Sequence, residues 1–80
     1  MSNNLKRFLQ DRGIKQTELA KESDRSISTI SKICLNTMDP GIVTKNKIII
    51  CLKEKFHLVL SEKDVTYIFP VNKEEIYAKT

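Results

Sequence analysis

The sequence predicts an all-α fold, a compact bundle of about five helices. Two observations support this prediction. Apolar residues recur every three or four positions in four segments of the chain, the spacing of one face of an α-helix. In addition, three of the expected helices follow residues that commonly cap helix starts, namely Asn4, Ser26 and Ser61. At 80 residues the chain is one small domain that buries roughly 60% of its unfolded surface.

A first helix is expected from Asn3 or Asn4 to Arg12. Either asparagine is a good capping residue, and Gly13 follows where a left-handed residue commonly ends a helix. The inner face of this helix carries three apolar residues at helical spacing: Leu5, Phe8 and Leu9.

Residues 16–35 are predicted to form two short helices joined by a tight turn. Leu19 and Ala20 mark the inner face of the first helix, and the small Ala20 lets the two helices cross closely. Residues 22–25 have no apolar periodicity, and Ser26 can cap the second helix. The inner face of that second helix carries Ile30, Ile33 and Cys34. This is the layout of a helix-turn-helix, whose second helix enters the major groove of DNA.

A fourth helix is expected over residues 43–55, after a polar loop with the turn signal Asp39-Pro40-Gly41. Residues 48–50, three consecutive isoleucines, have the β-propensity of a strand, but the polar residues on both sides favour a helix. Three consecutive residues cannot all face one side of a helix, so one isoleucine is expected at the surface or against a partner. The predicted inner face comprises Ile48, Cys51, Leu52 and Phe56.

A fifth helix, capped by the segment 61–64, is expected to run to about Ile68, and Pro70 ends it. It should bury Val65, Ile68 and Phe69. Residues 71–80 form a short tail whose conformation stays open between disorder, a strand and a partial helix. The domain prediction is therefore one helix-turn-helix domain over residues 1–70, followed by this tail.

The positive charge of the chain is concentrated in its first two thirds. The net charge is +4. Residues 1–55 hold 11 Lys and Arg against 6 Asp and Glu, a balance of +5, whereas residues 56–80 have a balance of −1, with 3 against 4. The excess therefore coincides with the predicted helix-turn-helix, as a phosphate-binding surface requires.

The composition also bounds the location of the protein and its chemistry. The chain has no apolar run long enough to span a bilayer, and its first four residues do not resemble a signal peptide, so we expect a cytoplasmic protein without a membrane partner. Cys34 and Cys51 lie in helical apolar patterns without metal-ligand spacing. They are interpreted as reduced core residues, with a disulfide or metal site as the alternative.

Nothing in the sequence supports catalysis. His57 is the single histidine and is expected in a loop or at a helix cap. Two glycines cannot form a glycine-rich phosphate loop, and Ser26, Ser28 and Ser31 have no base nearby in sequence. We therefore expect no enzyme activity, no cofactor and no metal.

Three segments resemble the Cro/phage-repressor (Xre) helix-turn-helix family: Leu-Lys-Arg-Phe-Leu at 5–9, Gly-Ile-Lys-Gln-Thr-Glu-Leu-Ala at 13–20, and Ser-Ile-Ser-Thr-Ile-Ser-Lys-Ile at 26–33. The resemblance runs from about Asn4 to Phe69 and implies a lambda-repressor-like domain. Asp24 stands where the family usually has glycine, and aspartate tolerates the left-handed conformation that this position requires. Ser23 and Arg25 stand where the family usually has apolar residues.

The predicted DNA contacts combine this resemblance with helical spacing. The resemblance implies that Gln16 contacts a phosphate and that Ile27, Ser28 and Lys32 face the bases. Helical spacing places these three residues and Ser31 opposite the inner face of their helix. Further phosphate contacts are expected from basic residues: Lys15, Arg25, Lys6, Arg7, Lys45 and Lys47. In the alternative interpretation, Lys32 is a solvated lysine and Gln16 a simple first-turn residue.

Two functions are consistent with the sequence. The first is a transcriptional regulator of phage or mobile-element type that binds double-stranded operator DNA as a homodimer, with the helix at 26–35 in the major groove. The alternative is an antirepressor of the same fold, which binds a phage repressor protein. Its candidate contacts are the isoleucines Ile27, Ile49 and Ile50, and the acidic residues Asp24 and Asp39 near the recognition helix also suit it.

Overall fold

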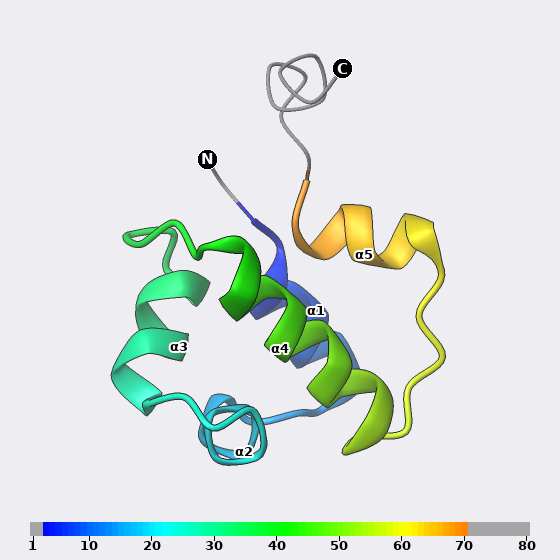
Figure 1. Ribbon diagram of the computed structural model, residues 1–80, viewed down its shortest axis with the longest axis horizontal. Helices are drawn as coiled ribbons and strands as arrows, with labels where there is room; N and C mark the ends of the chain where they lie inside the picture. The colour runs from blue at the N-terminus through cyan, green and yellow to red at the C-terminus, as the bar shows by residue number, and fades with distance from the viewer. Residues whose placement is uncertain (1–2, 71–80) are drawn as a thin grey trace.

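The computed structural model describes residues 3–70, which form five helices and no strand (Figure 1). The helices are α1 (Leu5–Arg12), α2 (Gln16–Glu22), α3 (Ile27–Cys34), α4 (Ile42–Glu54) and α5 (Glu62–Ile68). The all-α prediction is confirmed, including the helix across residues 48–50. The prediction for the tail, residues 71–80, lies outside the described residues.

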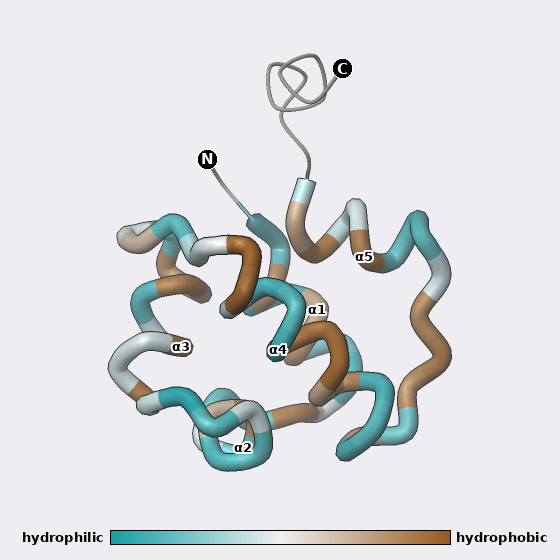
Figure 2. Tube along the Cα trace, in the orientation of Figure 1, coloured by the Kyte–Doolittle hydropathy of each residue, from teal (hydrophilic) through white to brown (hydrophobic). Residues whose placement is uncertain are grey.

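α4 runs diagonally across the bundle, with α2 and α3 to one side of it and α5 to the other (Figure 1). α2 packs against both α3 and α4, and α1 packs against α3. Along α3 and α4, hydrophobic and hydrophilic stretches alternate, as expected of helices with one buried face (Figure 2). The buried side chains of all five helices form one core cluster, whose fully buried members include Leu5, Leu19, Ile30, Ile48 and Ile68.

The start of α1 differs from the prediction in its capping residue. The side chain of Asn4 makes no capping hydrogen bond, because its backbone (φ −113°, ψ 23°) is not in the extended conformation that a capping side chain needs. The Oδ1 atom of Asn3 instead accepts a hydrogen bond from the Leu5 N–H at 2.9 Å. Asn4 joins α1 to α5, since its backbone N–H donates to the Ile68 carbonyl and its Nδ2 to the Tyr67 carbonyl.

The predicted helix ends at Gly13, Ser26 and Ser61 are confirmed, and α4 lies within one residue of the predicted range 43–55. Gly13 ends α1 at φ 68°, in the left-handed region. The Oγ of Ser26 accepts from the Thr29 N–H at 3.1 Å and caps α3. Ser61 and Asp64 form a capping box at the start of α5, and the hydrogen bonds that Ser61 donates hold the pKa of the Asp64 carboxyl below its usual range.

Burial along α4 and α5 follows the predicted inner faces with three differences. Phe56 and Val65 are only half-buried, Phe56 because it lies beyond the end of α4. Ile49 joins Ile48 in the core, whereas Ile50 is 51% exposed and is the surface isoleucine that the sequence predicts.

The two cysteines are free, buried core residues, as interpreted from the sequence. Burial raises the pKa of the Cys34 thiol to about 11, and burial, assisted by the nearby Glu22, also raises the pKa of Cys51. His57 lies exposed in the loop after α4, at φ 55°. Within residues 3–70, no cluster of three ligand-type side chains is arranged to hold a metal ion, and no helix has the length and apolarity needed to cross a membrane.

Candidate nucleic-acid interface

The candidate interface is built on α2, α3 and the turn between them. Ala20 of α2 is buried among core residues, in agreement with the close helix crossing that its small size predicts. The turn is closed by backbone hydrogen bonds to α2. The Ser23 N–H donates to the Leu19 carbonyl at 2.9 Å, and the Arg25 N–H donates to the Ala20 carbonyl at 3.0 Å. These bonds hold the start of α3 against α2.

The turn accommodates three residues that differ from the family pattern. Asp24 has φ 58°, so the predicted left-handed conformation is confirmed. Ser23 is buried, and its hydroxyl donates to the Ala20 carbonyl at 3.4 Å, which satisfies the polar group in an apolar position. Arg25 is half-buried, and its Nε atom lies inside the protein without a hydrogen-bond partner. The Arg25 stem therefore takes the place of an apolar side chain beneath the turn.

α3 buries one face and presents the other to solvent. Ile30, Ile33 and Cys34 belong to the core. The four residues predicted to face the bases lie on the other side: Ile27, Ser28 and Lys32 are exposed and Ser31 is half-buried. Ile27, 45% exposed, is an unusual apolar residue on this otherwise polar surface. The structure therefore brings together the four side chains of the predicted recognition surface.

The C-terminal end of α3 is attached to the segment before α1 by an arrangement that the sequence analysis missed. The Nδ2 atom of Asn3 donates to the Ile33 carbonyl at 2.9 Å. Asn36, which follows α3 at φ 59°, accepts from the Asn3 N–H at 2.7 Å and donates to the Asn3 carbonyl at 3.4 Å. We call these contacts the Asn3–Asn36 clamp. Asparagine after a helix signals a left-handed residue, but nothing in the sequence pairs two residues 33 positions apart.

The predicted phosphate contacts are distributed over several elements. Lys15 and Gln16 stand at the start of α2, Arg25 before α3, and Lys6 and Arg7 in α1. Of these, Gln16 and Arg25 are half-buried and the others are exposed. Basic or polar side chains therefore stand at the beginning of the helix-turn-helix, at the start of α2, and in its middle, in the turn before α3.

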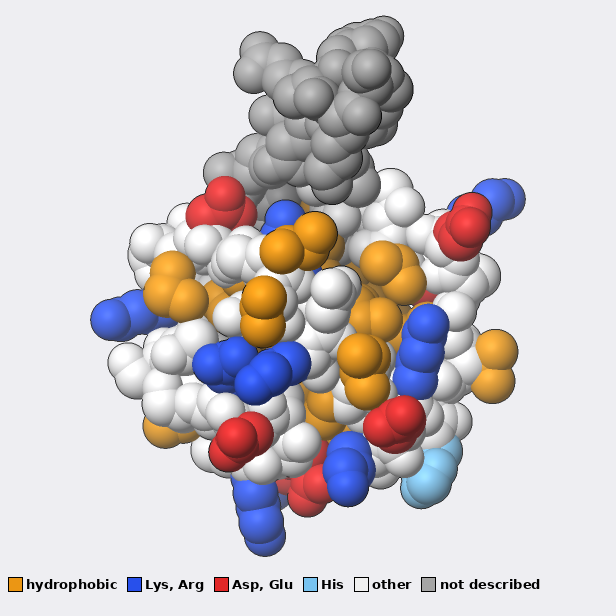
Figure 3. All heavy atoms as spheres, in the orientation of Figure 1, with side chains coloured by type: hydrophobic (Ala, Val, Ile, Leu, Met, Phe, Trp, Pro, Cys, Tyr) orange, Lys and Arg blue, Asp and Glu red, His pale blue; other side chains and the backbone are white. Residues whose placement is uncertain are grey.

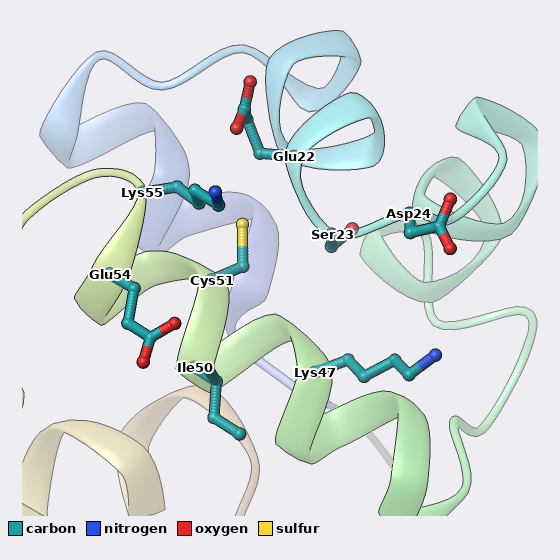
Figure 4. A pocket seen from close by; sticks show the side chains of 8 residues that line it. All are labelled: Glu22, Ser23, Asp24, Lys47, Ile50, Cys51, Glu54 and Lys55. Carbon is teal, nitrogen blue, oxygen red and sulfur yellow. The ribbon is translucent and has the colours of Figure 1, made fainter.

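The two predicted contacts on α4 have other neighbours. The Nζ atom of Lys45 lies 5.9 Å from the centre of the Phe69 ring, a cation–π distance that holds this lysine toward the end of α5. Lys47 lines an open hollow together with Glu22 and Asp24 (Figure 4). Acidic and basic side chains are also intermixed over the face shown in Figure 3. Both lysines are therefore weaker phosphate candidates than the residues of the helix-turn-helix.

The prediction of Ile49 as a protein contact is wrong, because its side chain is 9% exposed and belongs to the core. Successive residues of a helix are rotated by about 100°. Ile48 and Ile49 both fall within the wide buried face of α4, and one further step brings Ile50 to the surface. Ile27 and Ile50 remain as exposed candidates.

A comparison with protein families finds a match over most of the described residues. The family model of the Cro/C1-type HTH DNA-binding domain matches residues 4–48, from the start of α1 to the middle of α4. The match therefore includes α2, the turn and the whole of α3. The comparisons with curated proteins and with solved structures found no match.

Proposed function

The chain belongs to the Cro/C1-type helix-turn-helix DNA-binding family, and from this premise we propose that it is a sequence-specific transcriptional regulator of phage or mobile-element type. The proposal rests chiefly on the outer face of α3, which lies within the matched helix-turn-helix. This face is polar except for one isoleucine, Ile27. In this proposal α3 enters the major groove of operator DNA, and the bound protein blocks or adjusts transcription. The chemistry is binding, without a catalytic step.

The side chains of the outer face of α3 suit different base edges. Lys32 can donate to the O6 or N7 atom of a guanine, and Ser28 and Ser31 can exchange hydrogen bonds with several bases. Ile27 can contact the methyl group of a thymine. Lys15, Gln16 and Arg25 then bind phosphates on either side of the groove and set the orientation of α3.

The proposal is tested by selecting binding sites from random duplex DNA and measuring the affinity of the selected site at several salt concentrations. Binding should weaken steeply with salt, because phosphate contacts release counterions. Lys32→Ala should cost about 1–3 kcal/mol and relax the preference at one base pair. Lys63→Ala, which removes an exposed lysine from the remote α5, is the matched control and should have little effect. Absence of any selected site, or equal effects of the two variants, would contradict the proposed role of α3.

A second candidate function is binding to a phage repressor protein as an antirepressor. The exposed Ile27 at the N-terminal end of the recognition surface favours it, together with the exposed carboxylates of Asp24 and Asp39, which flank α3 in the sequence. A carboxylate repels phosphates, and an exposed isoleucine gains free energy only when another surface covers it.

Ile27→Ala and Lys32→Ala distinguish the two functions. On DNA, Ile27 covers no more than a thymine methyl and part of a sugar, so Ile27→Ala should weaken binding mainly at one base pair. In a protein groove, burying the side chain is worth roughly 1.5–3 kcal/mol, and added salt should not mimic its loss. Both variants are therefore compared at two salt concentrations, with the selected DNA and with a candidate repressor. A repressor complex that tolerates Ile27→Ala and dissociates in salt would contradict the second candidate.

A further inference from the structure

The outer face of α3 continues one residue beyond the end of the helix, at Leu35. This residue keeps a right-handed helical backbone (φ −83°, ψ −1°), and its N–H donates to the Ser31 carbonyl at 3.0 Å. Leu35 follows Ser28 by seven positions and Lys32 by three, so helical spacing places the three side chains on one face. Leu35 is 60% exposed, and neither the core nor the predicted DNA contacts include it. A large apolar side chain therefore stands in line with the predicted base contacts.

Hydrogen bonds fix the chain on the C-terminal side of Leu35. The N–H and the hydroxyl of Thr37 both donate to the Lys32 carbonyl, at 3.0 and 3.1 Å. The Asn3–Asn36 clamp joins the same point to the segment before α1. Leu35 thus extends from a held helix end, and its backbone keeps a defined position relative to α3.

The chain beyond Leu35 does not have the charge of a phosphate-binding segment. Residues 33–44 contain no lysine or arginine, and Asp39 is exposed among them. A carboxylate there repels phosphates, and an exposed leucine gains free energy only when an apolar group covers it. In the major groove of DNA that apolar group is the C5-methyl of thymine, because the other groups on the base edges are hydrogen-bond donors and acceptors.

We propose that Leu35 is a further specificity-determining residue, which contacts the methyl group of a thymine in the operator. Like the proposed function on which it rests, this role requires α3 to lie in the major groove. In one class of DNA-binding domain, the recognition helix contacts bases through the first, fourth, fifth and eighth residues of one face. The outer face has this spacing at Ser28, Ser31, Lys32 and Leu35. The seven residues from Ser28 to Leu35 span about 10 Å, which corresponds to about three base-pair steps of roughly 3.4 Å.

Leu35 and Ile27 then contact methyl groups at opposite ends of α3. Ile27 is the first residue of the helix and Leu35 follows the last. The eight residues between these positions span about 12 Å along the helix axis. The operator should therefore carry two thymines that are recognised through their methyl groups, separated by bases that are recognised through hydrogen bonds.

Deoxyuridine substitution tests this role, because it removes only the C5-methyl of a thymine and leaves its hydrogen-bonding groups unchanged. Each thymine of the selected operator duplex is replaced in turn, and the Kd of the full chain is measured by fluorescence anisotropy. Loss of a covered methyl group should raise the Kd about fourfold, and the wild-type chain should show this effect at two thymines. Leu35→Ala should raise the Kd of the unmodified duplex by about 5- to 10-fold and abolish the effect at one of the two thymines. Ile27→Ala should abolish the effect at the other.

Two variants control for general effects on binding. Leu35→Met keeps an apolar side chain of similar volume and should retain the dependence on both methyl groups. Val59→Ala truncates an apolar side chain that is 95% exposed in the loop before α5, and it should change neither the Kd nor the methyl dependence. Circular dichroism melts check that each variant is folded.

The proposed contact is overturned if Leu35→Ala keeps the same dependence on every methyl group, because Leu35 then covers no thymine. It is also overturned if Leu35→Ala leaves DNA binding intact and weakens the complex with a candidate repressor, since Leu35 then belongs to a protein interface. Absence of any selected operator contradicts the proposed function and the Leu35 contact together. A selected operator that is bound without a methyl effect of Leu35 contradicts the Leu35 contact alone.

Discussion

Replacing Asn3 with alanine removes the side chain that joins the start of α1 to the end of α3. The Asn3 side chain accepts from the Leu5 N–H and donates to the Ile33 carbonyl, both at 2.9 Å and both partly buried. A typical intramolecular hydrogen bond contributes about 1 kcal/mol net, and loss of a helix cap costs about the same. We therefore expect Asn3→Ala to lower the free energy of unfolding by about 2 kcal/mol. In a domain of this size that corresponds to a melting temperature roughly 8–16 °C lower.

Thermal and urea unfolding followed by circular dichroism measure this loss. Asn4→Ala is the matched control, because its side chain makes one exposed hydrogen bond, to the Tyr67 carbonyl, and should cost about 1 kcal/mol or less. Asn36→Gly tests the other half of the clamp, since glycine keeps the positive φ while the two side-chain bonds to the Asn3 backbone are lost. If Asn3→Ala is no more destabilising than Asn4→Ala, the clamp does not hold α3 in the way described.

Three further predictions concern the core and the titratable groups. Ile30→Asp places an unpaired carboxylate in the core and should abolish the helical circular dichroism signal, whereas Lys32→Ala should preserve it. Burial raises the pKa of Cys34 to about 11, so the free energy of unfolding should fall as the pH rises from the ordinary thiol pKa near 9 to about 11, because the thiol ionises first in the unfolded chain. Thermal unfolding of Cys34→Ala over the same pH range should show a smaller loss of stability. Because the pKa of the Asp64 carboxyl is lowered, the capping box should stabilise the fold above about pH 4, and this stabilisation should be lost as the pH falls and the carboxyl protonates. The stability of Asp64→Asn should depend less on acid pH.

The local sequence was sufficient to predict the helices and most of their ends. Gly13 and Asp24 adopt left-handed backbones and Ser26 caps α3, because each of these features depends on a few neighbouring residues. The outer and inner faces of α3 also follow from helical spacing alone. One short-range feature was misassigned: the sequence permits either Asn3 or Asn4 to cap α1, and the backbone conformation decides for Asn3.

Other features required the tertiary structure. Ile48, Ile49 and Ile50 are chemically identical, and the position of α4 in the bundle determines that the first two are buried and the third is exposed. The same packing places Lys45 over Phe69 and Lys47 beside the hollow, although both residues are simply basic in the sequence. What the sequence determined by itself was the pattern within each helix, because capping, turn conformation and helical periodicity act over a few residues. Contacts between residues far apart in the chain, such as the Asn3–Asn36 clamp, depend on how the helices pack and were decided only by the fold.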